Sequence, residues 1–214
     1  MGILVGGTGL YFKALTQGLA AVPPIPAEIR DSVRRRLVEE GVTVLHAELA
    51  KRDPAAAARL MPNDRARVTR ALEVVLATGH SLVTWHEQGL PASLDPANAA
   101  RIFLSVGREE LARRISDRFD AMMAAAALEE VRTLAARRLG PSLPAMKAHG
   151  VPWLIRHLNG EVTLADAIER AKLETRQYTK RQGTWFRNQL PGFAWVEPAR
   201  ARDAIATQLR ALSK

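Results

Sequence analysis

Near its start the chain carries Ile-Leu-Val-Gly-Gly-Thr-Gly-Leu-Tyr-Phe at residues 3–12, and this stretch indicates the fold class. Residues 3–5 are apolar, as in a buried strand of a parallel sheet. The glycines after them predict a tight turn, and residues 10–19 predict a helix. A glycine-rich turn between a strand and a helix is half of a phosphate-binding site, because backbone N–H groups can approach an anion there. An ordinary strand–helix turn explains the same residues equally well.

A short buried strand normally has parallel neighbours on both sides, so residues 3–5 favour an α/β fold. Met1 stands almost directly before this strand, and we therefore expect that further strands are encoded upstream of it. The chain has no Gly-x-x-x-x-Gly-Lys-[Ser/Thr] segment, so we expect no Walker-type phosphate loop within it.

The composition favours a polyanionic partner. The chain has 214 residues, 47% of them hydrophobic, which suits one large domain or two small ones. Its 31 Lys and Arg against 22 Asp and Glu give a net charge of +9, although an Arg-rich proteome produces basic proteins without such a partner.

The absence of cysteine excludes disulfides, thiolate zinc sites and a Cys nucleophile. The five histidines lack metal-ligand spacing, and no apolar run is long enough to span a membrane. We expect no metal site in the chain and a cytoplasmic location.

Residues 24–100 predict an all-helical subdomain inserted into an α/β core of residues 1–23 and 101–214. Prolines form a stiff connector before it, and no strand candidate interrupts it up to about residue 89. Asn63 and Asp64 are both candidate N-caps of one of its helices, and Gly79 is the stop signal of that helix. The predicted helices cover residues 27–41, 42–52, 54–61 and 64–78.

The rest of the chain predicts two strands among further helices. Thr163 with Asp166 resembles a capping box, which opens a long helix that continues into residues 175–187. The other predicted elements are a strand over 102–106, one long helical stretch over 108–138, a loop over 140–150, a strand over 193–196 and a helix over 200–212.

The segment Thr-Arg-Gln-Tyr-Thr-Lys-Arg-Gln-Gly-Thr-Trp-Phe-Arg at 175–187 holds four cations and three aromatic rings but no acid. Such a strip can neutralise phosphates while Tyr178, Trp185 or Phe186 stack on bases. The alternative is a basic helix end whose aromatic rings turn into the core.

Three further sets of cations are candidates for binding a ligand. Arg67 and Arg70 lie one helical turn apart, but a solvated face explains them as well. Arg118 has acidic neighbours in sequence and could simply pair with them. Lys147 lies in a loop bounded by Pro and Gly, where a cation is easily directed at a ligand.

Taken in order, these segments resemble the bacterial tRNA dimethylallyltransferases, and the resemblance covers nearly the whole chain. The matching segments are Leu-Val-Gly-Gly-Thr-Gly-Leu-Tyr-Phe at 4–12, Asp-Pro-Ala-Ala-Ala-Ala-Arg at 53–59, Pro-Asn-Asp-x-x-Arg at 62–67, Arg-Ala-Leu-Glu-Val at 70–74, Arg-Phe-Asp-x-Met at 118–122, Leu-Pro-Ala-Met-Lys at 143–147 and Thr-Arg-Gln-x-x-Lys-Arg-Gln-x-Thr-Trp at 175–185.

The resemblance implies transfer of the dimethylallyl group of dimethylallyl diphosphate to N6 of the adenosine 3′-adjacent to the anticodon, with Mg²⁺ present. It implies a partial P-loop-NTPase-like α/β core with the helical insertion gripping the anticodon stem, mostly α by content, in an enzyme that acts as a monomer. Gly6, Gly7 and Thr8 correspond to the diphosphate-binding turn, where preorganised donors would stabilise the departing diphosphate. Thr8 and Arg118 correspond to catalytic positions, and a guanidinium can grip phosphate oxygens.

The resemblance also assigns tRNA contacts to Arg30 and to three segments, with the target base drawn out of its stack. These residues are Arg30, Ala66, Arg67, Arg70, Lys147, His149, Gly150, Lys180, Arg181, Gln182, Thr184, Trp185 and Arg187.

The chain departs from the family pattern in ways that bear on activity. Family members begin well upstream, with a Gly-rich phosphate loop and a catalytic aspartate, and Mg²⁺ ligands are expected there too. The family's Arg-x-x-Gly-Tyr-Arg is here Lys-Ala-His-Gly-Val-Pro at 147–152, which loses an aromatic ring and a cation. Gly183 lies inside a predicted helix at a cost of about 1 kcal/mol. We therefore expect an N-terminally truncated enzyme that keeps RNA affinity with little transferase activity. The alternatives are a non-catalytic RNA-binding remnant and a partner piece encoded separately.

Overall fold

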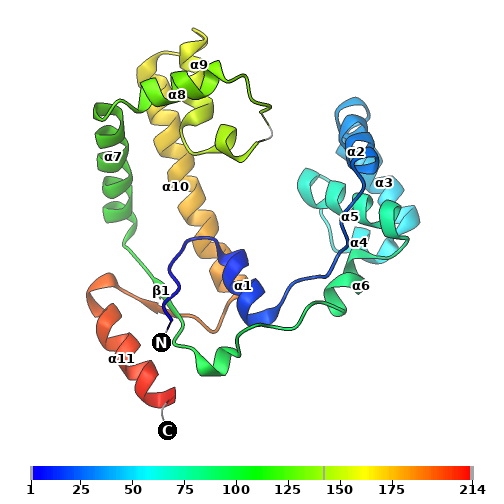
Figure 1. The fold of residues 1–214 in the computed structure, drawn as a ribbon, viewed down its shortest axis with the longest axis horizontal. Helices are drawn as coiled ribbons and strands as arrows, with labels where there is room; N and C mark the ends of the chain where they lie inside the picture. Colours follow the sequence, from blue (N-terminus) through cyan, green and yellow to red (C-terminus); the bar gives the residue numbers. More distant parts are fainter. Residues whose placement is uncertain (1, 142, 213–214) are drawn as a thin grey trace. The chain divides into compact units, whose positions relative to one another are not determined.

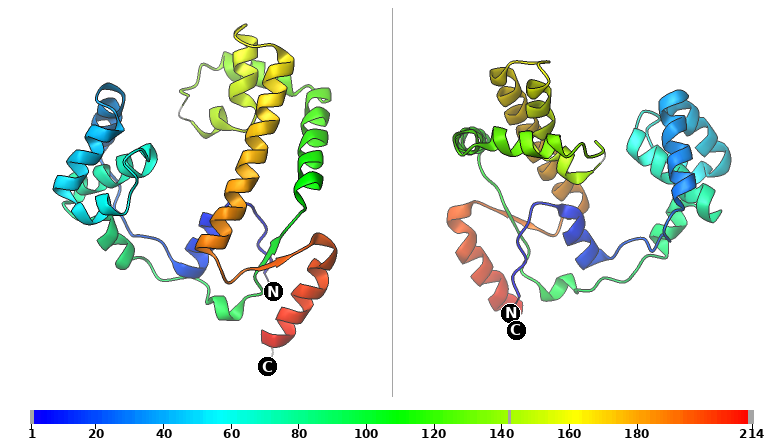
Figure 2. Two further views of the ribbon diagram at one scale, coloured as in Figure 1. Left: turned by 180° about the vertical axis from the view of Figure 1, so that it is seen from behind. Right: turned by 45° about the horizontal axis from the view of Figure 1, so that its top comes forward.

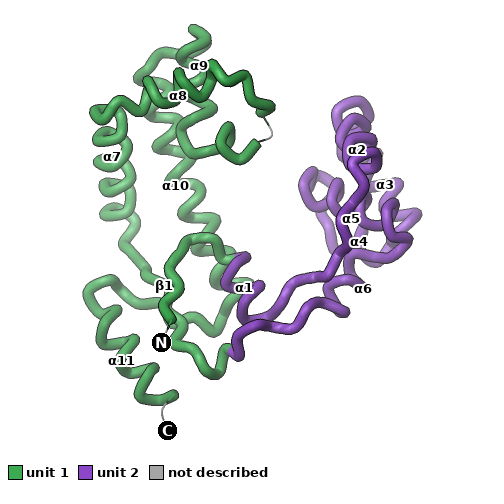
Figure 3. The backbone as a smooth tube through the Cα atoms, in the orientation of Figure 1, with its two compact units in different colours: residues 1–9, 96–214 green, residues 10–95 purple. Residues whose placement is uncertain are grey.

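The computed structural model describes residues 2–141 and 143–212 and is mainly helical, with a small parallel sheet (Figure 1). The chain divides into two compact units (Figure 3). One, the mixed unit, consists of residues 1–9 and 96–214; the other, the helical unit, consists of residues 10–95. The helical unit therefore begins at residue 10 and includes most of the first helix, Gly9–Gln17. The sequence pattern predicts that residues 1–23 belong to the α/β core. Among the described residues, no helix combines the length and the apolar character needed to cross a membrane.

The helical unit contains the first six helices, and none of residues 10–95 is assigned to a strand, as the sequence predicted. The helices are α1 (Gly9–Gln17, of which Gly9 belongs to the mixed unit), α2 (Ala27–Glu39), α3 (Val42–Arg52), α4 (Pro54–Ala58), α5 (Arg65–Thr78) and α6 (Leu82–Glu87). The bounds predicted for α3 and α5 are confirmed, whereas α4 ends earlier than residue 61.

Apolar side chains from three helices form the core of the helical unit. Val33 of α2, Leu45 and Leu49 of α3, and Val68 and Leu72 of α5 are each at most 1% exposed. Full burial of a side chain of this size is worth about 1.5–3 kcal/mol, so these five residues hold α2, α3 and α5 together.

Local signals in the sequence fix the ends of α5. The Asp64 carboxylate accepts a hydrogen bond from the Arg67 N–H at 3.1 Å, which satisfies one of the free donors at the helix start. Gly79 ends the helix in the left-handed region at φ 71°, where glycine has no Cβ to clash. Of the two candidate N-caps, Asp64 is the one that the structure uses, and the stop predicted at Gly79 is confirmed.

The mixed unit contains the sheet and the remaining helices. Its elements are β1 (Ile102–Leu104), α7 (Arg108–Ala124), α8 (Ala127–Ala136), α9 (Val151–Leu158), α10 (Leu164–Gln189), β2 (Ala194–Val196) and α11 (Ala201–Leu212), with short 3₁₀ turns at Pro96–Asn98, Pro144–Lys147 and Pro198–Arg200. The predicted strands at 102–106 and 193–196 are present but shorter, and the closing helix is confirmed. Thr163 is the N-cap of α10, whereas the Asp166 carboxylate accepts from the Thr163 hydroxyl, so only the Thr163 half of the predicted capping box is formed.

The sheet of the mixed unit is parallel and carries an aromatic cluster. Phe103 of β1 lies opposite Trp195 of β2, with the ring centroids 4.0 Å apart. The Phe186 ring from α10 lies 4.8 Å from that of Phe103 and 5.5 Å from that of Phe193. These contacts fasten the last turns of α10 to the sheet.

A second core joins α7, α8, α9 and the N-terminal half of α10. Its buried residues are Phe119, Val131, Leu154, Ala167 and Ala171. α7 runs beside α10 in Figures 1 and 2, and α8 and α9 pack together next to it. This core positions the loop between α8 and α9 on the side of α10.

The prediction of a strand at residues 3–5 is wrong in this structure. Ile3 and Val5 are unpaired and 78% and 92% exposed, and no described residue belongs to a strand beside them. A strand exists only when a neighbour satisfies its backbone groups, so an apolar run without such a neighbour has no strand structure.

The prediction of one helical stretch over 108–138 is also wrong. α7 ends at Ala124, and α8 begins at Ala127 after Ala126, which has φ 67°. An alanine run gives no stop signal, since alanine is the best helix former. The break redirects the chain so that Val131 of α8 reaches the second core, and tertiary packing thereby overrides propensity.

The helix α9 was not predicted at all. Its apolar positions 151, 154, 155 and 158 follow the i, i+3, i+4, i+7 pattern of an amphipathic helix, and Pro152 fits its first turn. This pattern is the sequence signal that would have found it.

Candidate functional site

The glycine turn, residues 6–9, lies open at the start of α1. Gly6, Gly7 and Thr8 are exposed, whereas Gly9 is buried. The first N–H groups of a helix have no partner within it, and no acidic side chain lies in the first turn of α1. The local chemistry therefore suits an anion, because free donors and the helix dipole both favour negative charge there.

The C-terminal half of α10 supports the glycine turn. The side-chain amide of Gln182 donates a hydrogen bond to the Gly7 carbonyl at 2.7 Å. A Cβ on Gly9 would collide with the indole of Trp185 and would lie 3.1 Å from the Phe186 ring. Position 9 must therefore be glycine for the turn to lie this close to the helix.

The loop before α9 lies against the same helix. The rings of His149 and Tyr178 are 4.7 Å apart, and the Arg181 guanidinium lies 5.9 Å from the Tyr178 ring centroid. Gly150 has φ 93°, and a Cβ on it would come within 2.9 Å of the Phe119 ring. The loop at 147–150 is thus fixed between α7 and α10.

Arg118 is exposed on α7 and directly precedes two residues with structural contacts. Phe119 is buried in the second core, and Asp120 forms an ion pair with Lys172 of α10 at 2.7 Å. No ion pair of Arg118 occurs among the described residues. The structure places Arg118 on the helix that packs on the 147–150 loop, and within the described part of the chain no hydrogen bond or ion pair joins Arg118 to the glycine turn.

The basic strip of α10 does not present one continuous face. Each residue turns an α-helix by about 100°, so Lys180 lies about 160° around the axis from Gln182, and Arg187 about 140°. The Arg187 guanidinium instead lies 4.3 Å from the ring centroid of Trp195, on the sheet side. Lys180 and Arg187 therefore do not face the glycine turn as Gln182 does.

The aromatic residues of the strip also separate. Phe186 is only 3% exposed and belongs to the aromatic cluster of the sheet, so for this ring the structure bears out the alternative of an aromatic side chain turned into the core and not a stacking surface for a base. Trp185 is half-buried against Gly9. Tyr178 lies beside His149 and Arg181 and is likewise half-buried. Thr184 is exposed and donates a hydrogen bond to the Lys180 carbonyl at 3.1 Å.

The candidate cations of the helical unit are mostly engaged locally. Arg30 donates to the Ile25 carbonyl at 3.1 Å. Arg67 forms an ion pair with its own cap Asp64 at 2.7 Å, and Arg70 lies 3.6 Å from the buried Glu73. Ala66 is exposed beside them.

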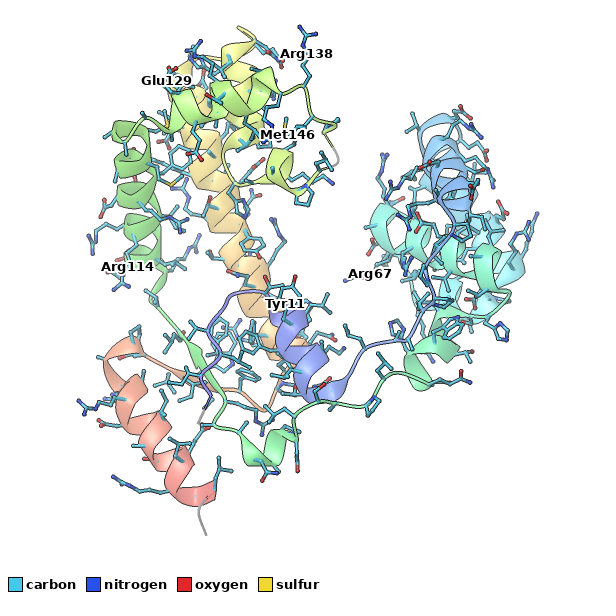
Figure 4. The ribbon with its side chains drawn as sticks, viewed as in Figure 1. Tyr11, Arg67, Arg114, Glu129, Arg138 and Met146 are labelled. Atoms are coloured by element: carbon cyan, nitrogen blue, oxygen red, sulfur yellow. The ribbon has the colours of Figure 1, made fainter. Side chains whose placement is uncertain are left out.

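The charge of Arg67 is shared with its cap. The Arg67 backbone N–H is the main cause of the lowered pKa of Asp64. Figure 4 shows the Arg67 side chain extending outward from α5, so its charge is available to a ligand although it is shared with Asp64.

Lys147 is exposed at the end of the 3₁₀ turn that also carries Met146, which Figure 4 labels. The described residues provide no acid paired with Lys147, Lys180 or Arg181. These three cations are therefore free to neutralise phosphates.

The sequence did not reveal two features of this site. Lys172, which is 6% exposed, joins α10 to α7 through Asp120, and nothing in the spacing of the two residues indicates a contact. Gln182 was assigned to RNA, and its contact with Gly7 spans 175 positions. A contact between residues so far apart in the sequence leaves no periodic pattern by which one sequence could reveal it.

The resemblance implies Mg²⁺, which proteins hold mainly through carboxylate oxygens. Within residues 2–141 and 143–212, no group of three or more His, Asp or Glu side chains is placed to hold a metal ion. The described residues thus do not form a dedicated cage for the ion, and no chemical step is assigned to a metal held by them.

Comparisons with known proteins agree with one another. The family model described as IPP transferase matches residues 1–189. The chain is 62% identical over 204 residues to a tRNA dimethylallyltransferase of Nitrobacter hamburgensis, covering 95% of this chain and 64% of that protein. It is 61% identical over 205 residues to a tRNA dimethylallyltransferase of Rhodopseudomonas palustris, covering 96% of this chain and 64% of that protein. The chain therefore spans about two thirds of the length of these relatives.

Solved structures show the same likeness. A tRNA isopentenylpyrophosphate transferase from Bacillus halodurans matches with a TM-score of 0.57 and 31% identity, over 96% of this chain and 66% of that one. A eukaryotic dimethylallyltransferase acting on tRNA matches with a TM-score of 0.63 and 26% identity, over 97% of this chain and 54% of that one.

Proposed function

Because this chain belongs to the IPP transferase family, we propose that the whole protein transfers a dimethylallyl group from dimethylallyl diphosphate to N6 of the adenosine 3′-adjacent to the anticodon of a tRNA. The bond between the allylic carbon and the diphosphate oxygen breaks, a carbon–nitrogen bond to N6 forms, and diphosphate and the N6 proton leave. To residues of this chain we assign the binding of both substrates, and to none of them the removal of that proton.

The glycine turn supports the diphosphate part of the proposal. Negative charge grows on the leaving diphosphate as the allylic bond breaks, and preorganised donors stabilise it. Gly7 and Thr8 are exposed residues, and their N–H groups and the Thr8 hydroxyl are proposed as such donors. Arg118, exposed and without an acid partner in the described part of the chain, is proposed as a further diphosphate ligand.

The loop and helix beside the turn support the RNA part. Lys147 and Lys180 are proposed to contact phosphates, and the His149–Tyr178 ring pair with Arg181 is proposed as a stacking platform for an unpaired base. The exposed cations of α5 in the helical unit, Arg67 and Arg70, are proposed to contact the anticodon stem.

The single observation that carries the proposal is the hydrogen bond from Gln182 to Gly7, together with Trp185 beneath Gly9. It places the candidate diphosphate turn against the helix that carries the candidate RNA contacts. We further propose that the parallel pair β1 and β2 belongs to a P-loop-like core, since the similar solved structures are transferases of this family.

Binding of the two substrates to the purified chain tests this function. An anticodon stem-loop should bind more tightly than a stem-loop of scrambled loop sequence at the same salt concentration. Thr8→Val should weaken dimethylallyl diphosphate binding about fivefold or more through the loss of one hydrogen bond to a charged group. Thr43→Val, at an exposed threonine of α3, is the matched control. Equal affinity for both RNAs, or equal effects of the two threonine variants, would contradict the proposal.

A further inference from the structure

The residues of α10 that contact other loops form one stripe along the helix. Positions 171, 178, 182 and 185 are spaced by seven, four and three residues, so they lie on one face. Ala171 lies 3.7 Å from where a Cβ on Gly150 would be, Tyr178 meets His149, and Gln182 meets Gly7. Lys180 is on the other side of the helix.

The hydrogen bond from Gln182 also determines the direction of a second group. A trans peptide is planar, so its C=O and N–H point in opposite directions. The Gly7 carbonyl is held toward α10 at 2.7 Å from Gln182 Nε2, and the N–H of the same peptide unit belongs to Thr8. That N–H therefore points away from α10, on a segment where Gly7 and Thr8 are both exposed.

We propose that Gln182 is a positioning residue for the glycine turn and not a ligand of the RNA: its amide holds the Gly7 carbonyl and thereby aims the Thr8 N–H at the diphosphate of the prenyl donor. The diphosphate part rests on the proposed function, whereas the positioning part does not. Trp185 beneath Gly9 provides the second anchor of the turn. The 180–187 segment is thus divided, with Gln182 and Trp185 serving the donor site and Lys180 on the other side left for RNA.

A selective label makes the contact directly observable. Glycine followed by threonine occurs at residues 7–8 and 183–184 of the chain. A chain labelled with ¹³C at glycine carbonyls and ¹⁵N at threonine gives one correlation for each pair. The first reports the carbonyl that Gln182 binds, and the second reports whether α10 remains folded.

The variants are chosen to remove only the donor. Gln182→Met keeps the length and helix propensity of the side chain but cannot donate a hydrogen bond. Gln177→Met is the matched control, because Gln177 is exposed on the same helix. Inorganic pyrophosphate is titrated against each labelled chain, and a labelled anticodon stem-loop is titrated separately.

We expect Gln182→Met to shift the Gly7–Thr8 correlation in the carbonyl dimension, to leave the Gly183–Thr184 correlation near its place, and to weaken pyrophosphate binding about fivefold or more. RNA affinity should stay within about twofold of wild type, and Gln177→Met should change none of these.

An unshifted Gly7–Thr8 correlation in Gln182→Met would overturn the inference, as would unchanged pyrophosphate affinity or a loss of RNA affinity as large as that of Lys180→Ala. If pyrophosphate does not bind the wild-type chain at all, the diphosphate part of the proposed function fails. The carbonyl shift then decides by itself whether Gln182 positions the turn.

Discussion

Lys172 Nζ of α10 lies 2.7 Å from Asp120 Oδ1 of α7, and this ion pair links the two helices that flank the 147–150 loop. Lys172 is buried, and Glu169 lies further away at 3.5 Å. The hydrogen bond from Lys172 holds the pKa of Asp120 below its ordinary value of 3.8. The same bond raises the pKa of Lys172 above 10.5 against the opposing effect of burial.

These shifts predict how the pair contributes to stability across pH. A lowered carboxylate pKa gives stability that is present above about pH 4 and lost as the pH falls through the folded-state value. A raised lysine pKa gives stability that is lost as the pH rises beyond about 10.5. The stability difference between wild type and Asp120→Asn, measured by urea unfolding, should be constant near neutrality and shrink in acid. A difference that grows in acid would contradict this assignment. Asp117→Asn, at an exposed acid of α7, is the control.

Gly150→Ala should destabilise the mixed unit, because φ is 93° and the new Cβ would meet the Phe119 ring. Gly160 has φ 76° with nothing within 4 Å of a Cβ, so Gly160→Ala measures the cost of the backbone conformation alone, about 1–2 kcal/mol. Gly150→Ala should cost about 1–3 kcal/mol more, the range for overpacking a core. Thermal and urea unfolding give both numbers, and equal losses would show that Phe119 moves aside freely.

Ala126→Gly should stabilise the chain by about 1 kcal/mol, because Ala126 has φ 67° between α7 and α8 and glycine adopts this conformation without strain. The same change at Ala121, an exposed position inside α7, should destabilise by about 0.5–1 kcal/mol. Opposite signs in urea unfolding are therefore expected. If both changes destabilised the chain, the backbone conformation of Ala126 between α7 and α8 would not be strained.

Asp64→Ala should cost about 1 kcal/mol through loss of the N-cap of α5. Asp64→Asn keeps an oxygen that accepts from the Arg67 N–H but removes the charge, so it should cost less. Urea unfolding of both variants separates the cap from the ion pair with Arg67. If Asp64→Ala and Asp64→Asn lost the same stability, the stabilising effect would come from the charge of Asp64 and not from its N-cap hydrogen bond.

Lys180→Ala should weaken binding of the anticodon stem-loop and reduce the slope of log affinity against log salt by about 0.7–0.9, the value for one phosphate contact. Lys51→Ala, at an exposed lysine of α3 that has no assigned RNA contact, should leave the slope unchanged. A fluorescence titration over a range of salt concentrations measures both. If Lys51→Ala changed the slope as much as Lys180→Ala, the effect would come from the net charge of the chain and not from a phosphate contact of Lys180.

The sequence by itself determined the local structure wherever the cause is local. The caps Asp64 and Gly79, the N-cap Thr163 and the 3.6-residue periodicity of α5 act within one or two turns, so the bounds of α5 and the start of α10 could be predicted. The family was likewise recognised from the order of its segments, and the family comparison confirmed it.

Tertiary structure decided whatever depends on a distant neighbour. Residues 3–5 have a strand's composition, but strand structure needs a paired backbone, and the alanine run at 124–127 breaks because Val131 packs in a core that local propensity does not describe. The strip at 175–187 carried the right residue types, yet only the folded helix showed that Gln182 faces Gly7 while Lys180 faces away. The types of residues in the site were therefore encoded locally, whereas their partners were fixed by packing between segments up to 175 positions apart.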